Sequence, residues 1–456
     1  TKPKTKGDKM LTKTEAQNLC QEVLKRCGSN EAQLILMVDD DALTRFANNT
    51  IHQNVAERNV SLTLRLVAGK RNGMATTNRV DSDSLDELVA HALVNANASP
   101  EDPDFPGLAE PAEFSQVDAL DQATAEYSPE QRAQEVGVVC RLAKEKGLNA
   151  SGAFSTGTGE LAIANNKGLL ADHAISEADF QTVVMSEDSS GRAHASGWRI
   201  AGIPVESLGR EAIDKAERGR NPQNIEPGKY SVVMDPYVTQ DLLQMLNMGG
   251  MGARAVLEGR SWMNDREGKE AMSTLVTIWD DGTDPGGLPL PFDFEGVPKQ
   301  RVEIVTEGTV MGPVYDRYTA SKAGTTSTGH ALPPAFYMYS PVAVNLFMAP
   351  GDSSVAEMIG KTERGLYITR FWYTRPVHPR DAVITGMTRD GVFLIENGEL
   401  TIPVKNLRFT QSYVEALSEV EAVSQDTRLL SSEFGNVATR VPALKINDFN
   451  FTGSTV

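Results

Sequence analysis

Apolar residues near the start of the chain follow two different spacings, which predict strands and helices packed against one another. Residues 60–66 alternate strictly between apolar and polar, so one face of a strand should be buried. Residues 85–96 instead place apolar side chains three and four positions apart, which is typical of a helix with one apolar stripe. A helix that ends at Gly28 and a short apolar strand at 34–38 precede them. This combination predicts an α+β lobe over residues 10–99.

A second lobe is predicted after a proline-rich linker at residues 100–117, because proline removes backbone donors and interrupts regular structure. Ser128-Pro129-Glu130-Gln131 is typical of a helix start with a capping box. Short strands separated by glycine and asparagine turns, such as 151–155 and 161–165, should follow. With a closing helix, these elements predict a lobe over residues 118–225.

The composition changes from Gly228 onward to glycine, proline and many short apolar runs. Asp390-Gly391 and Asn397-Gly398 flank alternating runs, and such dipeptides supply the positive φ angles of tight hairpins. The pattern predicts a β-rich domain over residues 228–456. Because the two lobes form an amino-terminal α+β domain over residues 10–225, the fold class expected for the whole chain is α+β.

Residues 242–263, LLQMLNMGGMGARAVLEGRSWM, combine helical spacing with a group of glycines. Apolar residues recur at helical intervals on both sides of Gly249, Gly250 and Gly252, which predicts a helix with a break or a close-packing point. The pattern G-x-G-x-x-A also matches a dinucleotide-binding fingerprint, but that fingerprint needs a strand that runs into the glycines. The preceding residues have a helical period, so we interpret this match as accidental.

The Leu257-Glu258-Gly259 step after these glycines resembles the TldD/PmbA family of two-domain peptidases. Active subunits of that family carry His-Glu-x-x-x-His directly before Leu-Glu-Gly. Superposing the two steps without a gap places Gly250, Met251 and Ala255 at the positions of the metal-binding His, the catalytic Glu and the second His. None of the three can ligate zinc, which is bound in proteins by Cys, His, Asp or Glu.

The resemblance covers most of the chain, in pieces with matching order and spacing. These pieces are Thr277–Asp281, Phe292–Pro298, Ser327–His330, Ala349–Asp352, Gly365–Tyr367 and Glu396–Lys405. The resemblance implies an α+β amino-terminal part and a large β-rich carboxy-terminal domain, in agreement with the patterns above. Active members also bind the metal through a cysteine near the carboxy terminus. The segment 429–441 offers Ser431, Ser432 and Glu433 in its place.

A member of this family without metal ligands looks like the PmbA, or TldE, type, which pairs with a ligand-bearing TldD-type chain. The resemblance therefore implies a non-catalytic subunit of a metallopeptidase complex that processes extended peptides. No cofactor is expected in this chain, zinc is expected in the partner subunit, and a homodimer is expected when the chain is alone. Two alternatives stay open: a self-sufficient metallopeptidase with unusual ligands such as His330 and Glu295, and a peptide-binding or structural protein without a peptidase partner.

Five residues are candidates for lining a peptide channel, which are Gly252, Glu258, Asp293, Glu295 and His330. Gly252 would let a peptide backbone approach closely. His330 belongs to Ser327-Thr-Gly-His330, which resembles the family's loop near the active centre. For Asp293 and Glu295, the simpler interpretation is a solvated loop, because their spacing is not that of a calcium-binding motif.

The charge of the chain limits its partners. Lys and Arg total 44 against 61 Asp and Glu, which gives a net charge of −17. A chain of this charge repels phosphate backbones, so we expect no nucleic-acid partner. Because no apolar run approaches the roughly 20 residues needed to span a bilayer, and the Lys-rich start lacks the apolar core of a secretory signal, we expect no membrane partner and a cytoplasmic location.

Overall fold

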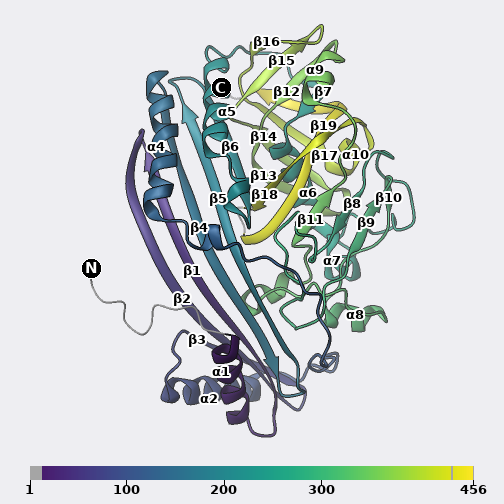
Figure 1. Ribbon diagram of the computed structural model, residues 1–456. Helices are drawn as coiled ribbons and strands as arrows, with labels where there is room; N and C mark the ends of the chain where they lie inside the picture. Colours follow the sequence, from purple (N-terminus) through teal and green to yellow (C-terminus); the bar gives the residue numbers. More distant parts are fainter. Residues whose placement is uncertain (1–12, 433–434, 455–456) are drawn as a thin grey trace.

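The computed structural model describes residues 13–432 and 435–454, which form two β-sheets with helices around them (Figure 1). The helices are α1 (Lys13–Arg26), α2 (Ser82–Ala98), α3 (Gln122–Ala125), α4 (Pro129–Glu145), α5 (Val205–Arg218), α6 (Pro236–Leu246), α7 (Ala253–Leu257), α8 (Arg317–Ala323), α9 (Val355–Gly360) and α10 (Tyr413–Ser418). The predicted α+β fold class is confirmed. Among the described residues, no helix is long and apolar enough to cross a lipid bilayer.

The first sheet has six strands in the order β3-β2-β1-β4-β5-β6. They are β1 (Glu31–Ala47), β2 (Thr50–Ala68), β3 (Arg71–Thr77), β4 (Asn149–Asn165), β5 (Leu170–Met185) and β6 (Ser190–Gly197). Strand β1 pairs with β4 along most of its length, so strands from both sides of the proline-rich segment share one sheet. The segment 100–117 contains no helix or strand, and Asn165 Nδ2 donates to the Ala109 carbonyl at 2.7 Å, which ties it to the sheet. The expected lobe and domain boundaries stay a prediction.

The expected break between the strands 151–155 and 161–165 is wrong. Residues 151–155 and 161–165 belong to the single strand β4, and β5 is equally continuous. Gly157 lies in the middle of β4, where a Cβ would come 2.6 Å from the Asp41 carboxylate of β1. A side chain at this position would have to displace the Asp41 carboxylate, so the glycine marks close packing and not a turn.

Opposite faces of the first sheet contact different parts of the molecule. Successive strand residues point to opposite faces. Leu34 and its alternating neighbours pack under α1 and α2, whereas Ile35 packs with Phe292 of the carboxy-terminal half. Phe46 lies near the other end of the sheet, in a cluster with residues of α4 and α5. Figure 1 shows α1 and α2 at one end of the long sheet, α4 toward the other end, and the β-rich half along its side.

Several local predictions are confirmed. Leu62, Leu64 and Leu66 are fully buried on one face of β2. The predicted capping box at Ser128 is present, with the Ser128 hydroxyl accepting from Gln131 N and the Gln131 side chain accepting from Ser128 N. Helix α2 begins at Ser82, slightly earlier than the stripe suggests, because Asp81 caps it.

The carboxy-terminal half contains a sheet of thirteen strands. They are β7 (Gly228–Met234), β8 (Ile278–Asp280), β9 (Val302–Thr306), β10 (Thr309–Val310), β11 (Asn345–Met348), β12 (Arg364–Ile368), β13 (Phe371–His378), β14 (Val383–Thr388), β15 (Val392–Glu396), β16 (Glu399–Pro403), β17 (Leu407–Ser412), β18 (Val420–Ser432) and β19 (Gly435–Ser454). Strand β19 pairs with β7, β11, β17 and β18, so it connects most of this sheet.

One of the two predicted hairpins is confirmed. Asn397 and Gly398 have positive φ angles of 52° and 82° and join β15 to its neighbour β16. Asp390 and Gly391 also have positive φ angles, but they join β14 to β15, which pair with other strands. This hairpin prediction was wrong because the dipeptide defines a turn geometry and leaves the choice of partner strand to tertiary packing.

Candidate functional site

The central segment with its group of glycines is a broken helix, as the sequence predicts. Helix α6 continues into a π-helical turn at Asn247–Met251, and α7 follows after Gly252. The backbone at the break pairs with Val314, which donates to the Met251 carbonyl and accepts from Ala253 N, both at 2.9 Å. The break is therefore held by the fold itself.

The residues at the family's metal-site positions do not fit zinc. Gly250, Met251 and Ala255 are buried and offer no ligand atom that zinc uses, and Met251 belongs to the main core of the carboxy-terminal half. Within residues 13–432 and 435–454, no group of three or more His, Cys, Asp and Glu side chains is arranged to hold a metal ion. Glu433 lies outside the described residues.

Helix α6, which precedes the group of glycines, lies beside the end of β18. In α6, Gln240 Nε2 donates to the carbonyls of Leu430 and Ser431 at 3.3 and 2.8 Å, and Gln244 donates to the Ser432 hydroxyl. Side-chain amides of α6 thus hold this helix against β18.

Ser431 also contacts Asp179 and His194 of the first sheet. Ser431 Oγ donates to Asp179 Oδ2 at 2.6 Å, and His194 Nε2 lies 2.8 Å from the same oxygen and 3.3 Å from Ser431 Oγ. A Ser-His-Asp triad needs the imidazole between serine and carboxylate, with a different ring nitrogen facing each. Here one nitrogen faces both groups, and Nδ1 has no partner in the described part of the chain. The arrangement does not support serine hydrolase chemistry.

Carboxylates form a row across the face of the first sheet beside this cluster. Asp41 of β1, Gly157 of β4 and Glu177 of β5 are aligned by strand pairing, with Asp39 and Asp179 two positions away. Burial, followed by the charges of Asp179, Asp41 and Asp39, raises the pKa of Glu177 to about 7. The pKa values of Asp39 and Asp41 are also raised, mainly by burial.

His330 is fully buried and bonded at both ring nitrogens. Its Nε2 lies 2.8 Å from Asp280 Oδ1 and its Nδ1 lies 2.9 Å from Thr328 Oγ1. Burial and the nearby Lys299 ammonium lower the pKa of His330, although Asp280 opposes them. A metal or peptide at this imidazole would have to replace an internal hydrogen bond.

The other channel candidates occupy three different settings. Asp293 is buried and accepts backbone N–H bonds from Glu295, Val297 and Ala331, which is the role of a turn-forming carboxylate. Glu295 is buried, accepts from Arg317 N at 3.0 Å, and lies 3.7 Å from Arg65 of β2.

Glu258 is exposed and paired with Arg260, and Gly252 lies against the Pro341 carbonyl. None of the five candidates lines either of the two cavities that lie between the halves of the molecule. Their role in a peptide channel stays a prediction.

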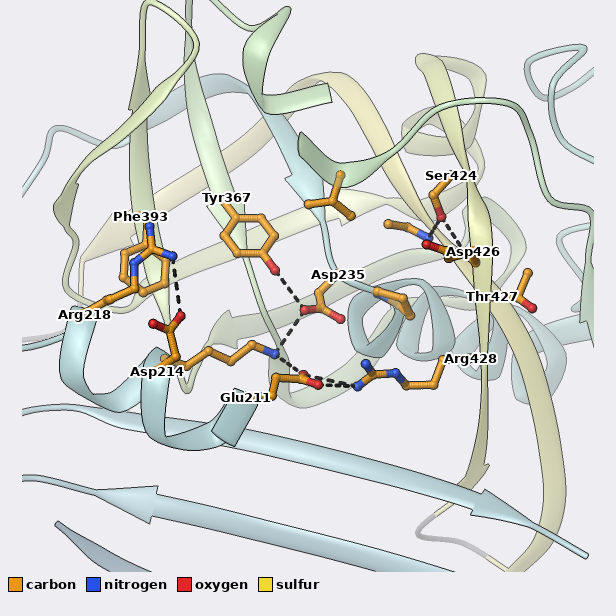
Figure 2. A pocket seen from close by; sticks show the side chains of 14 residues that line it. Glu211, Asp214, Arg218, Asp235, Tyr367, Phe393, Ser424, Asp426, Thr427 and Arg428 are labelled. Atoms are coloured by element: carbon orange, nitrogen blue, oxygen red, sulfur yellow. Dashed lines mark hydrogen bonds and ion pairs between the residues drawn. The ribbon is translucent and has the colours of Figure 1, made fainter. Parts of the chain in front are cut away.

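A cavity of about 390 Å³ lies between α5 and the carboxy-terminal sheet (Figure 2). Lys215 of α5 is buried at its wall, with Nζ 2.7 Å from Glu211 Oε1 and 3.1 Å from Asp235 Oδ2. Tyr367 of β12 donates to the same Asp235 oxygen at 3.0 Å. Arg428 of β18 closes the network, with Nη1 2.9 Å from Glu211 Oε2.

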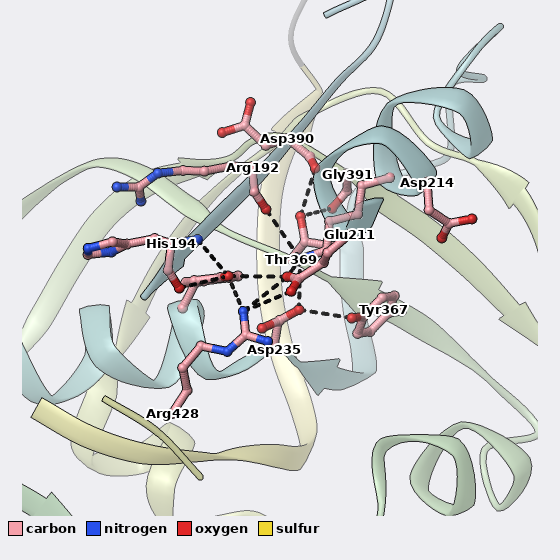
Figure 3. A network of polar contacts seen from close by, with 12 residues as sticks. Arg192, His194, Glu211, Asp214, Asp235, Tyr367, Thr369, Asp390, Gly391 and Arg428 are labelled. Atoms are coloured by element: carbon pink, nitrogen blue, oxygen red, sulfur yellow. Dashed lines mark hydrogen bonds and ion pairs between the residues drawn. The ribbon is translucent and has the colours of Figure 1, made fainter. Parts of the chain in front are cut away.

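This network joins the two halves of the molecule (Figure 3). Burial alone would lower the pKa of Lys215, but the carboxylates of Asp235 and Glu211 raise it, so the ammonium stays charged. Arg428 also donates to the hydroxyl of Tyr237, which in turn donates to the His194 carbonyl at 3.2 Å.

Sequence patterns do not predict this network. The only local signal is the four-residue spacing of Glu211 and Lys215 on α5, which is typical of an exposed helical ion pair. The remaining members, Asp235, Tyr367 and Arg428, lie far apart in the sequence. Burial of the Lys215 ammonium among them could therefore not be inferred.

Comparison with known proteins places this fold among metallopeptidase domains. A family model described as the PmbA/TldA metallopeptidase C-terminal domain matches residues 227–453, and another, described as PmbA/TldA metallopeptidase domain 1, matches residues 38–96. The chain belongs to the TldD/PmbA family.

Relatives support the same family and fold. A metalloprotease from Methanothermobacter thermautotrophicus is 27% identical over 289 residues, which are 62% of this chain and 63% of that protein, so the match spans less than two thirds of the relative. The metalloprotease PmbA of Escherichia coli O157:H7 is 23% identical over 82% of this chain and 83% of its own length. The crystal structure of TldE from Thermococcus kodakarensis has a TM-score of 0.87 at 19% identity and covers 96% of this chain and 100% of that chain.

The packing of the broken helix predicts a sharp difference between two neighbouring glycines. A Cβ at Gly252 would lie 2.0 Å from the Pro341 carbonyl oxygen, whereas a Cβ at Gly249 would meet nothing within 4 Å. We expect Gly252→Ala to lower the free energy of unfolding by about 2 kcal/mol or more, because backbone must move. Gly249→Ala should change it by less than about 0.5 kcal/mol. Urea unfolding measures both, and equal stabilities would contradict the packing described.

The carboxylate row predicts a pH-dependent stability. The pKa of Glu177 is about 7 in the folded chain and about 4.3 in the unfolded chain, so the folded chain binds this proton more tightly. The contribution of Glu177 to folding stability is therefore full below about pH 4.3 and is lost as the pH rises through about 7. Glu177→Gln should therefore raise the melting temperature at pH 8 and leave it nearly unchanged at pH 4.

Asp40→Asn is the matched control, because Asp40 is exposed and lies next to Asp39 and Asp41 in β1 but points to the other face. Calorimetric melting at both pH values measures the effect. A Glu177→Gln gain of the same size at pH 4 and pH 8 would refute this account.

Proposed function

We propose that this chain is a non-catalytic subunit of a TldD/TldE-type metallopeptidase complex, with the zinc and the chemistry in a TldD-type partner. The observation that carries the proposal is the absence of donors at Gly250, Met251 and Ala255 in a chain with the family's fold. A zinc peptidase needs ligands at fixed spacing so that the bound water is acidic enough to attack a peptide. Such a site is not formed by the described residues.

An exposed apolar face around the broken helix supports association with a partner. It consists of Met248, Leu257, Phe336, Met338, Tyr339, Tyr373 and Val377. These residues lie on segments that contact one another: Arg254 Nε of α7 donates to the Ser340 carbonyl, and Thr374 of β13 donates to Asp241 of α6. Grouped exposed apolar side chains are typical of protein interaction sites. We infer that the partner docks here, or a second copy when the chain is alone.

The alternative of a self-sufficient metallopeptidase is disfavoured by the bonds of its candidate ligands. To bind a metal, His330 would have to lose its hydrogen bond to Asp280 or to Thr328. Glu295 would have to lose the hydrogen bond that it accepts from Arg317 N. A peptide-binding protein without a peptidase partner is the remaining alternative, and turnover by a mixed complex distinguishes it.

We expect the purified chain to contain no stoichiometric zinc and to cleave no peptide alone. Mixing with a TldD-type chain from the same cell should give a complex that contains zinc and cleaves peptides faster than the TldD-type chain alone. Elemental analysis and peptide turnover measure these outcomes. One zinc per chain, lost on chelation together with hydrolysis by the isolated protein, would refute the proposal.

The apolar face makes a second prediction. Met338 is 69% exposed, so Met338→Asp should leave the fold intact while placing a charge in the interface. We expect the affinity for the TldD-type chain to fall by about ten-fold or more. Val94→Asp on α2, where Val94 is 63% exposed and far along the chain from this face, is the matched control. Titration calorimetry measures the affinity of both variants for the TldD-type chain. Equal affinities would place the interface elsewhere.

A further inference from the structure

A second cavity, of about 340 Å³, adjoins the first and shares Glu211, Thr427 and Arg428 with it. One side is formed by the end of β6, the residues after it and the start of α5. The other side is formed by the loop 285–287, β18 and β19. Trp198 Nε1 donates to the Pro285 carbonyl at 2.9 Å, so the two sides are joined at the wall of the cavity.

The charged side chains that line this cavity are Arg199, Arg428, Arg440 and Glu211. Three lining cations against one lining anion give this wall an excess of positive charge in a chain that carries −17, and Asp284 near Arg440 and Asp235 near Arg428 offset part of that excess. The neighbouring cavity has no such excess, because its lysine and arginines face a larger number of carboxylates. The second cavity therefore differs from its surroundings in the sign of the charge it presents.

The three guanidinium groups keep unused donors. Arg440 donates from Nε to the Gly286 carbonyl at 2.6 Å and from Nη1 to Thr427 Oγ1 at 3.2 Å. Arg428 makes its hydrogen bonds through Nη1 alone. Arg199 lies 3.8 Å over the Trp198 ring. Within residues 13–432 and 435–454, Nη2 of Arg440, Nε and Nη2 of Arg428, and the whole guanidinium of Arg199 have no hydrogen-bond acceptor.

Guanidinium groups with free donors at the wall of a cavity favour an anion of matching shape. Burial lowers the pKa of Arg440, but an arginine side chain stays protonated in proteins. A carboxylate accepts two parallel N–H bonds from one guanidinium, and such charge-assisted pairs are the strong ones. The cavity is larger than a carboxylate group alone and is also lined by Trp198, Leu208 and Leu429, which suits a ligand with apolar parts.

We propose that this cavity binds the carboxy-terminal carboxylate of a peptide, with Arg199, Arg428 and Arg440 as the recognising groups. The proposal rests on the proposed function, since it names the end of the peptide that this subunit would hold.

The experiment is titration calorimetry of the full chain without any partner. The probes are N-acetyl-tetraalanine as the free acid, the same peptide as its amide, and inorganic phosphate, all at constant ionic strength. We expect the affinity for the peptide acid to exceed that for the amide by about ten-fold or more, because the amide lacks the negative charge.

Three variants locate the binding. Arg199→Gln should fold normally, because Arg199 is exposed and makes no hydrogen bond within the described residues. This variant should bind the peptide acid about three- to ten-fold more weakly. Arg440→Gln should bind the peptide acid about ten-fold or more weakly, with folding checked by circular dichroism. Arg141→Gln is the matched control, because Arg141 is exposed on α4 and lines neither cavity.

Equal binding of acid and amide, or unchanged binding by both Arg199→Gln and Arg440→Gln, would overturn the proposal. Binding of phosphate without binding of the peptide acid would also overturn it, since the site would then recognise inorganic anions. Because these measurements use the chain alone, they are independent of turnover by the mixed complex. Tight binding of the acid without turnover in the complex would support this site and refute the proposed function.

Discussion

The arrangement of the two halves depends on the buried ammonium of Lys215. An ion of this kind is costly to remove from water, and the cost is offset only when counter-charges and hydrogen bonds surround it. Glu211 comes from the same helix, but Asp235 stands immediately before α6, and Arg428 comes from β18. The Lys215 ammonium therefore meets all its counter-charges in one relative placement of the halves. Because Asp235 directly precedes α6, that placement also fixes the position at which the broken helix starts.

The broken helix contains the three positions that the resemblance aligns with the family's metal-binding His, catalytic Glu and second His. In this chain they are Gly250, Met251 and Ala255, which are all buried. Met251 fills the core, and Gly250 lies so close to Ser261 and Trp262 that any side chain would collide with them. Neighbouring side chains fill the space at these positions. The segment therefore contributes to the stability and shape of the protein.

The sequence predicts local structure well and long-range pairing poorly. The capping box at Ser128, the buried face of β2 and the Asn397-Gly398 turn follow from neighbouring residues, and each is confirmed. The break expected between 151–155 and 161–165 is wrong because the contact of Gly157 with Asp41 of β1 cannot be inferred from adjacent positions. For the site, missing donors can be read directly from the chain, whereas the arginine-lined cavity requires side chains from three distant segments.

Strand β19 also bears on how the chain folds during synthesis. Residues 435–454 pair with β7, β11, β17 and β18, so most of the carboxy-terminal sheet lacks a central neighbour until this segment has left the ribosome. The first sheet is different, since its last strand ends at Gly197. The amino-terminal sheet can therefore form early, whereas β7 pairs with β12, more than 100 residues later, and with β19, more than 200 residues later. Such non-local pairing slows folding and leaves open strand edges that invite aggregation, which is the condition under which chaperones act.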